Sequence, residues 1–213
     1  MRSRFSSPFL TMQTLHRSLV MNRRVRVLAK HLANLLPENQ PLTGLDVGCG
    51  SGEVAVAVKT LRPTVKLEGV DVFVRPKTAI PVREFDGRTL PYPDNSFDFV
   101  MVVDVLHHTH DPKQVLGECT RVAKHAVLIK DHYCNSRFDE IRLRFMDWVG
   151  NRSYGVALPY HYLSSSQWKI VFGELGWFPE VTKRKLDLYP VPFRYIFDAN
   201  LHFIARLQRN DRQ

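Results

Sequence analysis

The sequence predicts an α/β fold built on a mostly parallel, doubly wound sheet, and three observations favour it. A short apolar strand that begins at Leu42 runs into a glycine-rich turn at 48–52 and then into a helical pattern. A second apolar strand, Val65 to Val72, carries an acid, Asp71, about twenty residues beyond the turn. Further apolar strands then alternate with helical patterns, which is the arrangement that a parallel sheet requires.

Length and composition are those of an ordinary globular protein with one domain. The chain has 213 residues, of which 44% are hydrophobic and 24% are charged. No apolar run approaches the roughly 18 residues that a membrane span needs. The three cysteines, Cys49, Cys119 and Cys134, are scattered and odd in number, so neither a disulfide framework nor a zinc site is expected. We therefore expect a cytoplasmic protein.

The net charge of +9 lies outside the central part of the chain. Residues 1–40 contribute +6, residues 41–131 contribute −1 and residues 132–213 contribute +4. A nucleic-acid or anionic-membrane face is one interpretation. Solvated helix surface is the interpretation that we favour. Residues 1–11 are expected to form a poorly packed leader. Their Arg and Ser content resembles that of a transit peptide, and Met12 or Met21 is an alternative first residue of the protein.

The first half of the chain divides into predicted elements at its proline and glycine positions. Apolar residues at helical spacing predict an amphipathic helix within residues 12–36, which ends before Pro37. A helix from Val54 to Leu61 follows the glycine turn, and a short strand from Pro81 to Phe85 precedes Asp86. The continuous apolar run Phe97 to Val103 predicts a strand that is buried on both faces.

The second half predicts a helix, a strand, an aromatic-rich insertion and two closing strands. Asp111 and Pro112 open a helix that runs to Ala123, because proline is tolerated in a first helical turn. A strand is expected at His125 to Lys130. Within 132–176 we expect helices at 136–149 and 164–175, with Ser164 to Ser166 supplying the second cap. Strands are expected at Trp177 to Leu188 and at Leu201 to Leu207.

The glycine turn has the chemistry of a nucleotide-binding turn. Gly48, Gly50 and Gly52 leave no Cβ between the backbone and a ligand, and the next helix aims free N–H groups at the turn. The dinucleotide fingerprint needs its third glycine three residues after the second, whereas here it comes two residues later. A NAD dehydrogenase is therefore set aside. A tight turn without a ligand is the alternative.

Two acids follow the turn at positions that suit a bound nucleoside. Asp71 ends the strand next to the first, where a carboxylate accepts hydrogen bonds from ribose hydroxyls. The alternative for Asp71 is a helix N-cap. Asp86 is placed to accept from an adenine amino group, and Phe73 and Val74 offer apolar surface for the ring.

These motifs together resemble one family. The order DVGCGSG at 46–52, a strand-ending Asp71, Asp86-Gly87, LPYPDNSFDFV at 90–100 and LHHTHDP at 106–112 resembles the class I S-adenosylmethionine (SAM) dependent methyltransferases. The match is nearest to the branch of ubiquinone and menaquinone C-methyltransferases and small-molecule methyltransferases, and it covers about residues 40–131.

The resemblance implies a fold and a division of the chain. The expected fold is a Rossmann-like, seven-stranded, mostly parallel sheet with an antiparallel last strand, with helices on both faces and a helical lid after strand five. A single methyltransferase domain would then span residues 1–213. Its parts would be the leader 1–11, the N-terminal helix 12–36, the SAM-binding core 40–131, the substrate lid 132–176 and the closing strands 177–213.

The resemblance also implies SAM as the cofactor and assigns site residues. The expected cofactor-binding residues are Asp46, Gly48, Gly50, Gly52, Asp71, Val72, Asp86, Gly87 and Asp104. A general base of histidine type is expected at His132, with His107 and His108 as further candidates, and the alternative is that each is a structural histidine. The expected substrate residues, from the aromatic insertion and its start, are Tyr133, Tyr160, His161 and Tyr162. A metal site at His107, His108, His110 and Asp111 was weighed on ligand type, and no metal is expected.

The function expected from these features is methyl transfer to a small, aromatic or lipid-like acceptor. An RNA methyltransferase is an alternative, although no RNA-binding module or Asn-Pro-Pro-Tyr motif is found and nucleic acid is not the expected partner. A SAM- or nucleotide-binding protein without catalysis is a third reading. The sequence leaves open the acceptor atom, the oligomeric state and any peripheral membrane contact.

Overall fold

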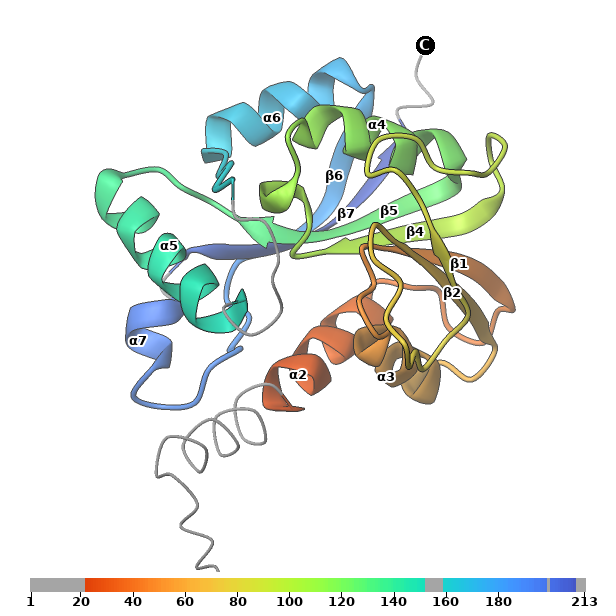
Figure 1. The fold of residues 1–213 in the computed structure, drawn as a ribbon, viewed down its shortest axis with the longest axis horizontal. Helices are drawn as coiled ribbons and strands as arrows, with labels where there is room; N and C mark the ends of the chain where they lie inside the picture. The colour runs from red at the N-terminus through yellow and green to blue at the C-terminus, as the bar shows by residue number, and fades with distance from the viewer. Residues whose placement is uncertain (1–21, 152–158, 199, 210–213) are drawn as a thin grey trace, which may run out of the picture.

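The computed structural model describes residues 22–151, 159–198 and 200–209 (Figure 1). Seven strands form one sheet in the order β3-β2-β1-β4-β5-β7-β6. The strands are β1 (Leu42–Val47), β2 (Val65–Asp71), β3 (Val82–Glu84), β4 (Phe97–Val103), β5 (Ala123–His132), β6 (Trp177–Lys183) and β7 (His202–Arg209). β7 lies between β5 and β6 and is antiparallel to both, while the other pairings are parallel. The expected seven-stranded sheet with an antiparallel last strand is confirmed.

Helices cover both faces of this sheet. α4 and α6 lie on one face and α2 and α3 lie on the other, while α5 and α7 lie beyond the carboxyl end of β5 (Figure 1). The helices are α2 (Asn22–Ala33), α3 (Glu53–Leu61), the 3₁₀ turn η2 (Leu106–His108), α4 (Pro112–Val122), α5 (Arg137–Asn151), α6 (Ser165–Glu174) and α7 (Arg194–Phe197). Among these helices, none is both long and apolar enough to cross a membrane.

The sheet separates two hydrophobic cores, because successive side chains of a strand point to opposite faces. Val100 and Val102 of β4 pack in the core under α4 and α6, where Trp168 and Phe172 are also buried. Phe99 and Met101 of the same strand pack in the core under α2 and α3. This burial on both faces explains why the strand at 97–103 is continuously apolar.

The helix starts predicted at Asp111 and at Ser164 form as expected. The side chain of Asp111 accepts from the backbone N–H of Gln114 at the start of α4. Ser164 and Gln167 form a reciprocal capping box at the start of α6. These local signals placed both helix starts correctly.

One expectation about the C-terminal part of the chain needs correction. The strand expected to continue to Leu188 ends at Lys183, because the chain leaves the sheet there and buries Leu186 and Leu188 in the core under α2 and α3. The short helix α7 was not expected from the sequence. The expected leader at 1–11 lies outside the described residues, as does part of the N-terminal helix. The division of the chain into its expected parts stays a prediction.

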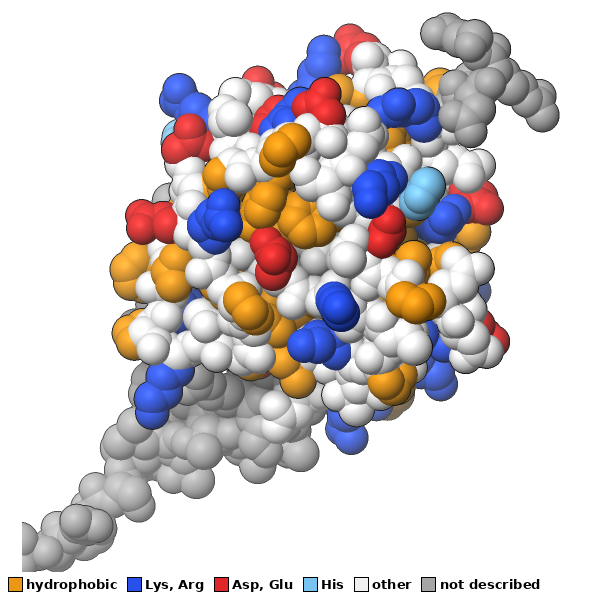
Figure 2. Space-filling view, turned by 90° about the vertical axis from the view of Figure 1, so that its right-hand side faces the viewer, with side chains coloured by type: hydrophobic (Ala, Val, Ile, Leu, Met, Phe, Trp, Pro, Cys, Tyr) orange, Lys and Arg blue, Asp and Glu red, His pale blue; other side chains and the backbone are white. Residues whose placement is uncertain are grey.

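Charges are mixed on the surface drawn in Figure 2. Lysine and arginine side chains there are interspersed with acidic ones and with apolar side chains, and they form no continuous basic area on that face. This distribution agrees with solvated surface as the interpretation of the net charge for that face.

Candidate functional site

The turn after β1 carries the chain into α3 through three glycines with left-handed backbone conformations. The φ angles of Gly48, Gly50 and Gly52 are +69°, +59° and +85°. Residues with a side chain rarely adopt this region. A Cβ on Gly48 would also lie 2.4 Å from Cγ2 of Val105. Each glycine of the motif is therefore required by the path of the backbone.

Asp71 joins this turn to the end of β2. Its Oδ2 accepts from the backbone N–H of Gly50 at 2.7 Å, and its Oδ1 accepts from the N–H of Phe73 at 3.1 Å. No helix follows Asp71 directly, so the alternative of a helix N-cap is excluded. Each carboxylate oxygen has a second lone pair, which leaves acceptor capacity for two further donors.

Asp86 stabilises the turn that follows β3. Its Oδ1 accepts from the backbone N–H groups of Arg88 at 2.8 Å and Thr89 at 2.7 Å. These hydrogen bonds lower the pKa of Asp86. Gly87 has a φ of +77°, as the tight turn requires. The contact of Asp86 and Gly87 with the cofactor stays a prediction. Oδ1 of Asp86 already accepts the two backbone hydrogen bonds of the turn.

Asp104 lies directly after β4 at the centre of a partly buried ion-pair network. Its carboxylate accepts from Arg24 of α2 and from Lys130 of β5. Burial favours the neutral acid, but the charges of Arg24 and Lys130 outweigh burial and hold the pKa of Asp104 well below its ordinary value. The predicted contact of Asp104 with the cofactor stays a prediction, and its carboxylate is shared by two cations.

His107 and His132 meet inside the protein at the carboxyl ends of β4 and β5. Nδ1 of His107 donates to Oδ1 of Asp131 at 2.7 Å, and the two imidazole ring centres are 4.6 Å apart. Both histidines are buried. Burial and the neighbouring Lys130 lower the pKa of His132 well below its ordinary value, so this imidazole is neutral. His132 is therefore enclosed by the protein, and within the described residues no open path leads from its ring to an acceptor. Its role as general base stays a prediction.

His108 and two residues of the insertion complete this cluster. His108 is half-buried, and burial together with the charge of His107 lowers its pKa to about 4. Asp147 of α5 accepts from the hydroxyl of Tyr162, and its Oδ2 lies 3.6 Å from Nε2 of His107. Burial raises the pKa of Asp147. The sequence analysis did not single out Asp147, since a lone acid in a helix carries no distinctive signal.

The comparisons with known proteins agree with this geometry. Residues 45–129 match the family described as a methyltransferase domain. The 27-O-demethylrifamycin SV methyltransferase of Amycolatopsis mediterranei is 31% identical over 110 residues, which are 46% of this chain and 40% of that protein. The demethylmenaquinone methyltransferase of Thermotoga maritima is 31% identical over 102 residues, which are 45% of this chain and 44% of that protein. The chain thus spans about half the length of the curated relatives it matches.

Solved structures share the fold over most of the chain. A chain of the complex that contains the Haloferax volcanii Trm112 methyltransferase activator has a TM-score of 0.71 at 15% identity, covering 93% of this chain and 95% of that chain. A SAM-dependent methyltransferase from Aquifex aeolicus has a TM-score of 0.60 at 18% identity, covering 92% and 98%. Residues 45–129 therefore resemble a methyltransferase domain. The relatives named as demethylmenaquinone and ubiquinone/menaquinone methyltransferases put this resemblance near the class I branch of those enzymes, whose cofactor is SAM.

The residues around the turn after β1 fit SAM. Asp46 is 3% exposed and makes no side-chain hydrogen bond within the described part of the chain, so its carboxyl lies unpaired beside the turn and its contact with the ammonium group of SAM stays a prediction. Burial first, and then the charge of Asp71, raise the pKa of Asp46 well above its ordinary value. Val72 and Phe73 are 57% and 70% exposed beside Asp71, which is an open apolar surface of the kind an adenine ring covers.

Arg75 is a residue near this site that the sequence analysis missed. Its Nη1 donates to the hydroxyl of Ser51 at 3.0 Å, and a Cβ on Gly50 would lie 3.2 Å from its Nη2. A guanidinium over the turn provides a positive charge that attracts the carboxylate of a methionine-type ligand. No motif marks this arginine in the sequence, because it reaches the turn only through the loop after β2.

The predicted substrate residues occupy two different places. His161 and Tyr162 lie against η2. The backbone N–H of His161 donates to the carbonyl of His107 at 3.1 Å, and Nδ1 of His161 donates to the carbonyl of Thr109 at 2.7 Å. Tyr160 lies beside them under the guanidinium of Arg144, at 4.7 Å. Tyr133 is instead buried and stacks on Phe203 with ring centres 4.3 Å apart.

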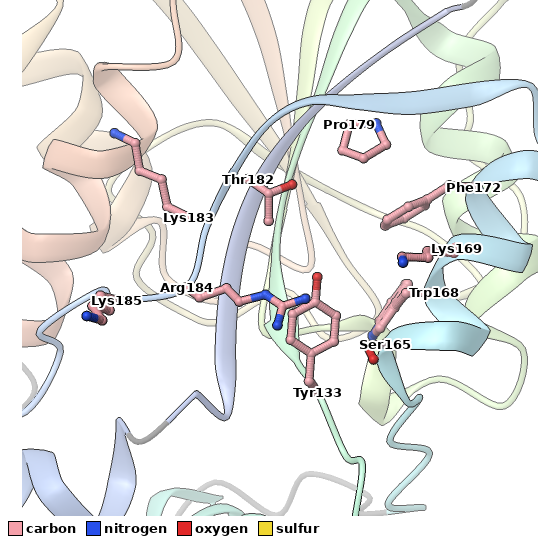
Figure 3. Close-up of a pocket in the computed structure, with 10 residues that line it drawn as sticks. All are labelled: Tyr133, Ser165, Trp168, Lys169, Phe172, Pro179, Thr182, Lys183, Arg184 and Lys185. Carbon is pink, nitrogen blue, oxygen red and sulfur yellow. The ribbon is translucent and has the colours of Figure 1, made fainter.

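A hollow of about 590 Å³ lies between α6 and the end of β6 (Figure 3). Arg184 extends over the ring of Tyr133 at its floor, with its guanidinium carbon 4.7 Å from the ring centre. Lys169, Lys183 and Lys185 also line it, and none of its lining residues is acidic. We call this hollow the basic groove.

Proposed function

We propose that this chain is a SAM-dependent methyltransferase whose acceptor is a small aromatic or lipid-like molecule. The observation that carries the proposal is the contact between Gly50 and Asp71, which holds a ribose-binding acid against a left-handed glycine turn. SAM supplies the activated methyl group when it is bound. The chain contributes binding and alignment: Asp71 for the ribose hydroxyls, Asp46 for the ammonium group and the surface of Val72 and Phe73 for the adenine.

An apolar acceptor is supported by the outer face of α5. Leu143 and Asp147 point into the protein, whereas the large apolar side chains Phe138, Ile141, Phe145, Trp148 and Val149 are each at least 41% exposed. At 3.6 residues per turn these five positions fall in one sector about 100° wide. We call this sector the α5 apolar face. Such a surface beside the carboxyl edge of the sheet suits delivery of a hydrophobic molecule.

Peripheral membrane contact is proposed through the same surface. Arg137 and Arg144 border the α5 apolar face and are exposed. Aromatic and aliphatic side chains flanked by arginines are the pattern of helices that lie in a membrane interface. Relatives named as demethylmenaquinone and ubiquinone/menaquinone methyltransferases act, by their names, on quinones, which supports an acceptor of this class.

The first experiment is calorimetric titration of the full chain with SAM, S-adenosylhomocysteine and NAD in parallel. We expect both adenosyl ligands to bind and NAD to give no heat. Radiolabelled SAM is then incubated with quinone-type, phenolic and lipid acceptors, and methylated product is measured. Binding without product from any acceptor favours the SAM-binding protein without catalysis, and absence of adenosyl binding contradicts the proposal.

A matched pair of variants tests the α5 apolar face. Ile141→Ser removes one of its exposed apolar groups, whereas Ile170→Ser removes an equally exposed side chain, 59% against 60%, from α6 on another part of the molecule. We expect only Ile141→Ser to raise the KM for a hydrophobic acceptor and to reduce sedimentation with anionic vesicles. Equal effects of the two variants argue against this surface.

RNA methylation is the second candidate, and the basic groove favours it. Four cationic side chains and no acid line that hollow, which suits a phosphate backbone. Titration with single-stranded RNA at several salt concentrations separates the two candidates. An affinity that falls steeply with salt and is weakened by Arg184→Gln supports RNA, whereas absent or salt-insensitive binding supports the small acceptor.

A further inference from the structure

Three side chains from η2 and α5 converge at the end of β4. One ligand atom from each of His107, His108 and Asp147 lies within 4.8 Å of the others. We propose that these residues bind a divalent transition-metal ion of the Zn²⁺ type. Imidazole nitrogens and a carboxylate oxygen are the ligands that such ions take in open, three-ligand protein sites.

The orientation of His107 is that of a metal ligand. Its Nδ1 donates to Oδ1 of Asp131 at 2.7 Å, which leaves the lone pair of the neutral ring on Nε2. Nε2 is buried and has no hydrogen-bond partner among the described residues, and the side chain is 2% exposed. A carboxylate that holds the far nitrogen of a ligating histidine is the usual outer arrangement at zinc sites. His107 therefore presents the fixed, unpaired lone pair of its Nε2 toward Asp147.

The spacing of the atoms distinguishes a metal site from a hydrogen bond. Nε2 of His107 and Oδ2 of Asp147 are 3.6 Å apart, which is too long for a good hydrogen bond. Two ligands at roughly 2.0–2.2 Å from a tetrahedral ion lie about 3.4 Å from each other. Only a small movement is needed to bind an ion between them.

The neighbouring trio of His107, Asp131 and His132 does not have this spacing. Oδ1 of Asp131 lies 2.7 Å from Nδ1 of His107 and 3.3 Å from Nδ1 of His132, and it also accepts from the backbone N–H of His132. Nζ of Lys130 lies 3.5 Å from Nε2 of His132 and would repel a cation. That trio is a hydrogen-bonded support, and the metal position lies on the other side of His107.

His108 and Tyr162 complete the proposed site. Nδ1 of His108 is buried without a hydrogen-bond partner in the part of the chain that the structure describes. The residue as a whole is half-buried, so solvent reaches this side of the site. The hydroxyl of Tyr162 donates to Asp147 and orients that carboxylate. The site thus has three ligands and positions left for water or an acceptor oxygen.

The balance of buried charge also favours a cation here. Two cations, Arg24 and Lys130, face three carboxylates, Asp104, Asp131 and Asp147. Burial opposes a charge on His107, but Asp131 outweighs burial and raises the pKa of His107, so the cluster favours a positive charge at this position. Buried charge without compensation is costly. The competing explanation is a proton on His107 that bridges Asp131 and Asp147, and it predicts no affinity for metal.

The test is titration of the full chain, first stripped with a chelator, with Zn²⁺ in a calorimeter and with Co²⁺ followed by visible absorption. We expect one ion per chain. Asp147→Asn and His108→Gln are expected to weaken binding at least tenfold, and Asp131→Asn by roughly 10 to 100-fold. His110→Gln is the matched control, because His110 is exposed two residues beyond His108 and outside the site.

The outcomes separate the two explanations. Absence of Zn²⁺ and Co²⁺ binding to the folded chain, or equal affinity in the ligand variants and in His110→Gln, overturns the proposal and leaves the bridging proton. Circular dichroism checks that each variant is folded, and the half-buried His108→Gln provides a ligand change with little effect on packing. SAM is absent from these titrations, so their result is independent of the proposed methyl transfer.

Discussion

The backbone N–H of Gly50 donates to Oδ2 of Asp71 at 2.7 Å, across 21 residues of sequence. This single contact fixes the carboxyl end of β2 against the turn that follows β1. Since these two strands are adjacent and parallel, both parts of the expected nucleoside site lie at one edge of the sheet.

Asp71→Ala tests the cofactor site directly. We expect the affinity for SAM to fall at least tenfold, because a hydrogen bond to a charged group contributes about 1.5–3 kcal/mol. Calorimetric titration measures the affinity, and thermal unfolding checks that the variant is folded. Glu84→Ala, an exposed acid at the end of the adjacent strand β3, is the control. Unchanged affinity in Asp71→Ala would remove the central argument for the site.

Gly48→Ala tests the backbone requirement of the turn. The new Cβ would lie 2.4 Å from Val105 at a φ of +69°, so we expect a loss of about 1–3 kcal/mol in the free energy of unfolding. Gly173→Ala in α6 is the matched control, since a Cβ there meets nothing within 4 Å. That change is expected to stabilise by about 0.5–1 kcal/mol. Urea unfolding measures both, and equal effects would show that the turn tolerates a side chain.

Lys130→Met tests the buried ion-pair network. Lys130 is fully buried beside Asp104, and removing one partner of a buried pair costs about 3–5 kcal/mol. Arg24 still compensates Asp104, so we expect the lower part of that range. Lys124→Met, which removes a surface pair with Asp98 at 3.3 Å, is expected to cost less than about 1 kcal/mol. Chemical unfolding compares the two, and a neutral Lys130→Met would mean that the network adds no stability.

Glu118→Gln tests a pH dependence. Hydrogen bonds from Arg121 lower the pKa of Glu118 below its ordinary value of 4.5, while partial burial opposes them. A lowered folded-state pKa contributes stability above the unfolded-state value and loses it as pH falls through the folded-state value. We expect the wild type to be more stable by about 1 kcal/mol at neutral pH, with the difference shrinking in the acid range. Urea unfolding across pH measures this, and a difference independent of pH would contradict it.

The fold was predictable because its signals are local. The apolar run at 97–103 and the helix starts at Asp111 and Ser164 depend on residues close in sequence, and each forms as expected. The end of β6 at Lys183 was not predictable, since Leu186 and Leu188 continue an apolar alternation but pack in the core under α2 and α3 after the chain has left the sheet. Periodicity reports which residues are buried and not against which element they pack.

The sequence by itself determined the glycine turn, the strand-ending acid and the order of strands and helices, because these follow from backbone conformation and from hydrophobic spacing. Only the tertiary structure decided which polar groups meet. Asp104 pairs with Arg24 and Lys130, and Asp147 reaches His107 from a helix forty residues away. Such contacts join residues that are far apart in the chain. The burial of these residues sets their pKa values and charges, which a local sequence pattern does not predict.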